Sequence, residues 1–143
     1  MSSGAAAGKV LLDLNLLLDV IQRREPHYLH SAAVLSRVAA GDLVGAVPGH
    51  AVTTIHYVVS RFEGVDAADE AVDWMLARLE VVPEGRDTFL RARNLGFRDF
   101  EDAVVASAAE QARCDRIVTR NVDDFRDSPV VAVTPRELEA DLG

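Results

Sequence analysis

The sequence has very little cysteine and lysine, and it has no long hydrophobic run. Cys114 is the single cysteine, so the chain forms no internal disulfide and offers no cysteine-rich zinc site. Lys9 is the single lysine, which leaves arginine to supply nearly all of the 15 basic side chains. No stretch approaches the ~18 uninterrupted apolar residues that a membrane-spanning helix needs. From these absences we expect a cytoplasmic protein with no membrane partner.

An excess of positive charge is also missing. With 23 acidic and 15 basic side chains the formal net charge is −8, whereas proteins that bind nucleic acids usually carry surplus Lys and Arg. Two arrangements still allow contact with a phosphate: acids can cluster to hold a cation, or arginines can form a local stripe. The charge therefore weakens a nucleic-acid function without excluding it.

Length and composition indicate one folded domain. A chain of 143 residues can bury one hydrophobic core, and 49 % hydrophobic with 27 % charged residues is far from the composition of disordered chains. Residues 1–8 lack the pattern of a signal peptide, and we expect them to form a flexible N-terminal lead. Residues 9–143 are expected to form a single domain.

Short β-rich apolar runs alternate with longer segments of helical period. The run 9–13 is almost continuously apolar, as in a strand buried on both faces of a parallel sheet. The other predicted strands are 43–47, 81–82, 115–119 and 130–133. The predicted helices are 16–22 behind an Asn15 cap, 27–40, 50–62, 66–79 behind an aspartate cap, 84–95, 99–113 and a capped helix that starts at 134–137. This order predicts an α/β fold in three layers, α/β/α, with a mostly parallel central sheet of four to five strands.

Acidic side chains follow the predicted strands and begin one predicted helix. Asp13 closes the first strand, and Asp99 and Asp102 stand three residues apart at the start of an apolar helix. Residues 121–124 add an asparagine and two aspartates after a later strand. Ligands of open parallel sheets bind beyond the carboxyl ends of the strands, so these segments can deliver oxygen ligands to one place.

Two interpretations of these acids are open. Asp13 can simply cap a turn, and Asp99 with Asp102 can form a capping-box variant that complements the helix dipole. Alternatively, the three acids form a divalent-metal site. Two carboxylates about 5 Å apart repel by about 3 kcal/mol at an effective dielectric constant of about 20, so three of them favour a bound cation. Oxygen ligands alone point to Mg²⁺ or Mn²⁺ over Zn²⁺.

Three segments carry a combined pattern of acids: VLLDLNLLLD at 10–19, DFEDA at 99–103 and CDRIVTRNVDDF at 114–125. Together they resemble a PIN domain, of the kind found in VapC toxins of bacterial toxin–antitoxin pairs. The resemblance runs over residues 9–138. It implies a PIN-like fold, a Mg²⁺- or Mn²⁺-dependent ribonuclease that cleaves RNA phosphodiester bonds, and a tendency to form homodimers.

The resemblance also assigns roles by position. Asp13 and Asp102 match family acids that bind the metal, and Asp99 matches a further acid that binds the metal or orients the attacking water. Asn121 stands where many members have Asp, and would position the water. Thr54 stands where many members have Glu. These two departures remove possible negative charges, so we expect a site that binds metal more surely than it cuts RNA.

Further residues and partners follow from the same resemblance. Weak ligands or residues that reach the metal through water are expected at Asn15, Thr54 and Asp124, and phosphate contacts are expected from Arg120, Arg98 and Arg24. A VapC-like protein implies an antitoxin that inserts a basic side chain among the acids. The net charge of −8 makes such a basic partner segment plausible.

Two rival functions are open at this point. One is a catalytically silent PIN-like module that a protein partner holds. The other is a receiver-like domain with a phosphoacceptor Asp. A receiver-like domain requires paired acids at the first strand and a lysine near a late strand, whereas the sole lysine here is Lys9.

Overall fold

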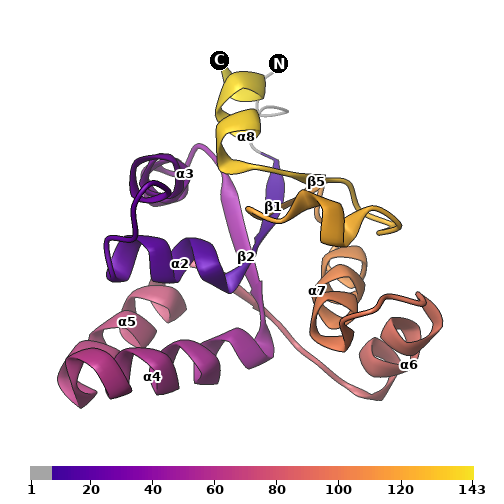
Figure 1. Cartoon of the computed structure of the whole chain (residues 1–143), viewed down its shortest axis with the longest axis horizontal. Helices are drawn as coiled ribbons and strands as arrows, with labels where there is room; N and C mark the ends of the chain where they lie inside the picture. The colour runs from indigo at the N-terminus through magenta and orange to yellow at the C-terminus, as the bar shows by residue number, and fades with distance from the viewer. Residues whose placement is uncertain (1–7) are drawn as a thin grey trace.

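The computed structural model describes residues 8–143 and contains a five-stranded sheet in which every pair of neighbouring strands is parallel (Figure 1). The strands are β1 (Lys9–Leu12), β2 (Val44–Pro48), β3 (Glu80–Val82), β4 (Arg116–Val118) and β5 (Ala132–Val133). Their order across the sheet is β3-β2-β1-β4-β5, so β1 is central. The predicted parallel sheet is confirmed, with five strands.

Helices cover both faces of this sheet. They are α2 (Leu14–Ile21), α3 (Tyr28–Ala40), α4 (Gly49–Glu63), α5 (Val65–Arg78), α6 (Arg86–Asn94), α7 (Phe100–Gln111) and α8 (Pro135–Leu142), with a short 3₁₀ helix, η1 (Val122–Phe125). Figure 1 shows α2, α3, α4 and α5 on one side of the strands and α6 and α7 on the other. The predicted α/β/α layering is therefore confirmed.

The central strand β1 is apolar because both of its faces are buried. Successive side chains of a strand point to opposite faces. Val10 and Leu12 pack into the larger hydrophobic cluster, on the side of α2 to α5, while Leu11 packs into a second cluster with α7. Burying each such side chain contributes about 1.5–3 kcal/mol relative to exposure. Because both faces are covered, no position of β1 after its first residue tolerates a polar side chain.

The carboxyl ends of the parallel strands meet at one edge of the sheet. The chain passes from β1 to β2 to β3 on one side, and then returns to place β4 and β5 on the other side of β1. The strand order therefore reverses between β1 and β4, the position at which open α/β sheets bind ligands. Asp13 follows β1 at this edge, and its N–H donates to the carbonyl oxygen of Val118 at 3.0 Å.

Two predicted helix caps are wrong. The first helix begins earlier than predicted, and Asp13 caps it by accepting a hydrogen bond from the N–H of Asn15. Asn15 therefore lies inside the first turn. The cap of α5 is Gly64, which lets Asp66 lie in the first turn, where its charge complements the helix dipole. The short helix η1 was not predicted, because four residues are too few to show a helical period.

Other ends of elements agree with the prediction. Gly41 ends α3 in the left-handed conformation, at φ 84°, which glycine adopts without steric cost. Thr134 and Glu137 form the predicted capping box of α8. Residues 1–7 of the expected flexible lead lie outside the described residues. Gly8, its last residue, accepts a hydrogen bond from the N–H of Val44 through its carbonyl oxygen. Every helix of residues 8–143 falls short of the length and apolar character needed to cross a bilayer.

Candidate metal centre

Asp13 is held at the start of α2 by two hydrogen bonds. Its Oδ1 accepts from the N–H of Asn15 at 3.2 Å, and its Oδ2 accepts from the hydroxyl of Thr119 at 2.8 Å. Thr119 is fully buried at the end of β4, so it joins the carboxyl ends of two neighbouring strands. The hydroxyl of Thr119 also accepts from the N–H of Asn121 at 3.1 Å. Asp13 and Asn121 are therefore tied to one buried hydroxyl.

Asp99 and Asp102 lie in the first turn of α7. Asp99 caps the helix, and its Oδ1 accepts a hydrogen bond from the N–H of Asp102 at 3.1 Å. Asp99 is exposed and Asp102 is partly buried. The capping interpretation is therefore correct for Asp99. It does not exclude a second role, because a capping carboxylate keeps lone pairs free.

The carboxyl of Asp102 is in an unfavourable environment for a negative charge. Burial, as the largest cause, and neighbouring carboxylates together raise the pKa of Asp102 from its usual 3.8 to about 6. In decreasing order of effect, these neighbours are Asp99, Asp124, Asp13 and Glu101. Asp102 thus senses charges from three separate segments of the chain, which indicates that the acids share one edge of the sheet.

The acids form two separate groups within the described residues. Within residues 8–143, no three His, Cys, Asp or Glu side chains lie together in an arrangement that could hold a metal ion. Hydrogen bonds unite Asp13 with Asn121 and Asp99 with Asp102, whereas the two groups interact only through their charges.

The match to a family model covers most of this arrangement. Residues 9–123, which contain β1, the start of α7 and the loop after β4, match the model described as PIN domain. The chain belongs to the PIN-domain family. The family match excludes the receiver-like alternative.

Similar proteins agree with this assignment. Ribonuclease VapC1 of Aquifex aeolicus (strain VF5) is 22 % identical over 135 residues, which is 91 % of this chain and 92 % of that protein. A toxin–antitoxin complex from Klebsiella pneumoniae contains a chain with a TM-score of 0.69 and 20 % identity, covering 88 % of this chain and 97 % of that one. VapBC2 from Rickettsia felis, bound to a DNA fragment from its promoter, gives a TM-score of 0.66 at 18 % identity, with coverage of 88 % and 98 %. These structures show a shared PIN fold.

The oxygen donors of this PIN domain fit a divalent cation chemically. Asp13, Asp99 and Asp102 offer carboxylates, which are the ligands that Mg²⁺ and Mn²⁺ prefer. The raised pKa of Asp102 marks a place where a cation would relieve repulsion. Asp124 lies in η1 near enough to affect Asp102, while the side chain of Asp123 is 94 % exposed and pairs loosely with Arg126 at 3.9 Å. Of this pair, Asp124 is thus the better candidate for a weak ligand.

Arg120 makes a contact that the sequence did not predict. Its Nε lies 3.2 Å from Oδ2 of Asp19, a fully buried carboxylate on α2 that also accepts a hydrogen bond from Ser31. The predicted phosphate contact of Arg120 stays a prediction, and the structure gives this residue a second role as the counter-ion of Asp19. A single acid within the apolar run 16–20 was the available signal for this pair.

The remaining predicted residues lie at different distances from the acids. Arg24 donates to Asn15 Oδ1 at 3.5 Å, so it reaches the helix that Asp13 caps. Arg98 is exposed beside Asp99 and has no hydrogen-bond or ion-pair partner in the described part of the chain. The hydroxyl of Thr54 donates to the carbonyl of His50 at 3.1 Å, within α4. The Thr54 hydroxyl therefore uses its proton in a hydrogen bond within α4.

A histidine links α4 to the helix that carries Asp102. His50 Nδ1 lies 2.6 Å from Glu84 Oε2, and His50 Nε2 lies 3.3 Å from Glu101 Oε2. Glu101 precedes Asp102 in the first turn of α7. His50 thus lies between two acids, at the point where the start of α4 meets the start of α7.

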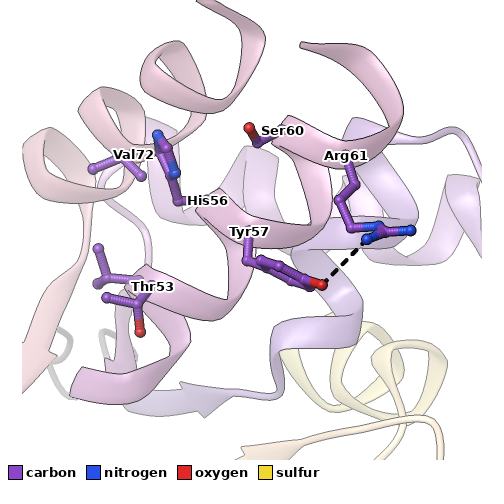
Figure 2. A pocket seen from close by; sticks show the side chains of 7 residues that line it. Thr53, His56, Tyr57, Ser60, Arg61 and Val72 are labelled. Atoms are coloured by element: carbon purple, nitrogen blue, oxygen red, sulfur yellow. Dashed lines mark hydrogen bonds between the residues drawn. The ribbon is translucent and has the colours of Figure 1, made fainter. Parts of the chain in front are cut away.

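A cavity of about 590 Å³ lies on the outer side of α4 and α5, and its lining includes none of the predicted acids. Figure 2 shows Tyr57 and Arg61 on the same side of α4, with the guanidinium donating to the Tyr57 hydroxyl at 3.4 Å. His56 and Val72 also line it. The candidate metal centre is instead at the carboxyl edge of the sheet, which shows that cavity size does not locate it.

Proposed function

We propose that this PIN domain is a ribonuclease that depends on Mg²⁺ or Mn²⁺ and acts as the toxin of a toxin–antitoxin pair. The observation that carries the proposal is the partly buried carboxyl of Asp102, whose pKa is raised by burial and by acids from three segments. The similarity to Ribonuclease VapC1 over 91 % of the chain supports the reaction type. Chains of toxin–antitoxin complexes with TM-scores of 0.66 and 0.69 support the biological setting.

Asp13 and Asp102 are the residues that would hold the cation. When bound, a divalent cation would supply a Lewis acid for the scissile phosphate and keep the carboxylates ionised. Thr119 fixes the orientation of Asp13 through its 2.8 Å hydrogen bond, so this carboxylate needs little rearrangement. Asp99 uses one oxygen to cap α7 and keeps the other for the cation or for an attacking water.

Asn121 would position water at the site. Its side-chain amide has both donors and an acceptor, and its backbone is fixed by the hydrogen bond to Thr119. Because Asn121 and Thr54 bring no carboxylate to the site, the acids of this PIN domain are expected to hold one cation well, with a second arriving only together with the substrate phosphate. Arg98 is exposed beside Asp99, and Arg24 donates to the side chain of Asn15. Both are candidates for phosphate contact.

A protein partner is part of the proposal. An antitoxin with a basic segment would place an Arg among the acids and thereby compete with the cation, which suits a chain of net charge −8. A homodimer and a cytoplasmic location remain predictions from the family.

The reaction itself gives the first test. The purified protein incubated with structured RNA and millimolar Mn²⁺ should cut the RNA, and excess EDTA should stop the cutting. Products are resolved on a denaturing gel, and Mg²⁺ is tested in parallel. RNA cleavage that continues in EDTA would exclude a metal-dependent mechanism, and a complete lack of cleavage would favour the catalytically silent module.

Metal binding gives the second test. Mn²⁺ or Mg²⁺ at 100 times its Kd should stabilise the protein by about 2.7 kcal/mol, which raises Tm by several degrees. Asp13→Asn should abolish this rise without unfolding α2, because asparagine also caps helices well. The matched control is Asp123→Asn, which removes an exposed carboxylate from the neighbouring loop and should keep the full rise. Equal loss in both variants would contradict a specific role for Asp13.

A further inference from the structure

A small cavity opens at the same edge of the sheet, on the side of β5. Its volume is about 270 Å³, and its lining includes His27, His30, Ser31, Arg120, Thr134 and Arg136. These residues come from the start of α3, the loop after β4 and the start of α8. We call this cavity the His/Arg pocket.

The His/Arg pocket is lined by basic side chains in a chain that is otherwise acidic. Four of its residues are His or Arg, and no Asp or Glu lines it. In the described part of the chain, two carboxylates contact lining residues: the buried Asp19 pairs with Arg120 at 3.2 Å, and Glu137 accepts a hydrogen bond from the N–H of Thr134 at 2.9 Å. Among these residues, Arg136 therefore carries the unpaired positive charge of the pocket. Such a concave basic surface attracts anions.

Most donors of the His/Arg pocket are free. Within residues 8–143, the side chains of His27, His30 and Arg136 make no hydrogen bond or ion pair. The ion pair with Asp19 engages Arg120 at Nε, and a guanidinium has five N–H donors in all. Arg120 therefore keeps donors for a ligand while Asp19 restrains its position.

The same short loop connects the His/Arg pocket to the candidate metal centre. Arg120 lies between Thr119, whose hydroxyl donates to Asp13, and Asn121, whose N–H donates to Thr119. A ligand that contacts Arg120 on one side of this loop therefore lies close to the acids on the other. An extended nucleic-acid chain presents a phosphate at each nucleotide and can reach both.

We propose that the His/Arg pocket binds a backbone phosphate of the RNA chain, adjacent to the phosphate that is cleaved. This inference rests on the proposed ribonuclease function. A volume of about 270 Å³ is below the range of pockets for drug-sized ligands, about 300–1,000 Å³, so it suits a phosphate group with part of a ribose. Arg136 and Arg120 supply the charge, and His27 and His30 supply further donors.

The test measures RNA binding with EDTA present, so that cleavage plays no part. A fluorescein-labelled RNA hairpin is titrated with protein at several salt concentrations, and fluorescence anisotropy gives Kd. Arg136→Gln should weaken binding roughly tenfold and reduce the slope of log K against log salt by about 1. His30→Gln should also weaken binding. Both residues are exposed and without described partners, so the variants should fold.

The matched control is Arg78→Gln. Arg78 is an exposed arginine at the end of α5, just before β3, and so lies at the opposite edge of the sheet. Its loss removes the same charge and should change Kd by less than about twofold. Equal weakening by Arg136→Gln and Arg78→Gln, or no measurable RNA binding by the wild type, would overturn the proposal.

Two further arms separate other sources of an anion. If inorganic phosphate shifts the NMR signals of His27 and His30 while Arg136→Gln leaves RNA affinity unchanged, the pocket holds free phosphate, and the RNA assignment is wrong. The RNA assignment is also wrong if a Glu-rich peptide binds in the pocket and does not compete with RNA. If the wild type cuts RNA with metal but Arg136→Gln binds RNA as tightly as the wild type, only the pocket proposal is rejected.

If Arg136→Gln weakens RNA binding but the wild type cuts no RNA, only the ribonuclease proposal is rejected.

Discussion

Asp102→Asn should abolish metal-dependent RNA cleavage and, at the same time, stabilise the metal-free protein at pH 8. Cleavage should fall by roughly 100-fold or more, since a Lewis acid contributes several kcal/mol to such a reaction. Stability should rise because Asp102 is repelled by neighbouring acids, and asparagine carries no charge. The side chains have nearly the same shape, and the N–H that bonds to Asp99 is retained.

The direction of the pH dependence follows from the raised pKa. The folded protein has a pKa of about 6 at Asp102 against the usual 3.8, so it binds more protons than the unfolded chain between these values. Stability therefore decreases as pH rises through this window and stays lower above it. The full pKa difference is worth about 3 kcal/mol, and solvent screening of this partly exposed group reduces the expected gain to about 1 kcal/mol.

Urea denaturation of wild type and Asp102→Asn at pH 4 and pH 8, with EDTA present, measures this effect. The variant should be more stable at pH 8, and the difference should vanish near pH 4. Asp123→Asn serves as the control, because that exposed carboxylate is not among the charges that affect Asp102. A variant that is less stable than wild type at pH 8, or one that still cuts RNA, would contradict the assignment of Asp102.

Arg120→Ala should cause the largest loss of stability among the variants considered. Removal of the guanidinium leaves Asp19 fully buried without its counter-ion, held only by its hydrogen bond from Ser31. Removing one partner of a buried ion pair typically costs about 3–5 kcal/mol, which lowers Tm by roughly 10 °C or more. The measurement is the free energy of unfolding in urea at pH 7.

Two variants give this prediction its controls. Arg37→Ala breaks the ion pair of Arg37 with Glu139, whose side chains are 28 % and 27 % exposed, and should cost at most about 1 kcal/mol. Asp19→Asn combined with Arg120→Ala should recover much of the loss, since no buried charge remains unpaired. If Arg120→Ala costs no more than Arg37→Ala, the ion pair with Asp19 does not stabilise the fold.

Both predictions describe one trade-off at the carboxyl edge of the sheet. Asp102 lowers stability in the metal-free protein, and we propose that it is retained for the cation. Asp19 stabilises the protein only while Arg120 accompanies it. Functional sites commonly keep such locally unfavourable charges, and the rest of the core compensates.

Local patterns in the sequence determined much of the fold. The apolar run of β1, the glycine that ends α3 and the capping box of α8 each depend on residues close together in the chain. The order of strands and helices then limits the topology to a parallel sheet with right-handed crossovers. The acids Asp13 and Asp102 were identifiable because they follow a strand and begin a helix.

Only the tertiary structure decided which partners these residues have. The hydrogen bond between Thr119 and Asp13 joins residues 106 positions apart, and Arg120 meets Asp19 across a similar separation. The sequence placed Arg120 beside the acids but could not show that a buried carboxylate engages its guanidinium. Local periodicity reports which face of an element is buried, whereas pairing of polar groups depends on how distant elements pack, and that is set by the whole fold.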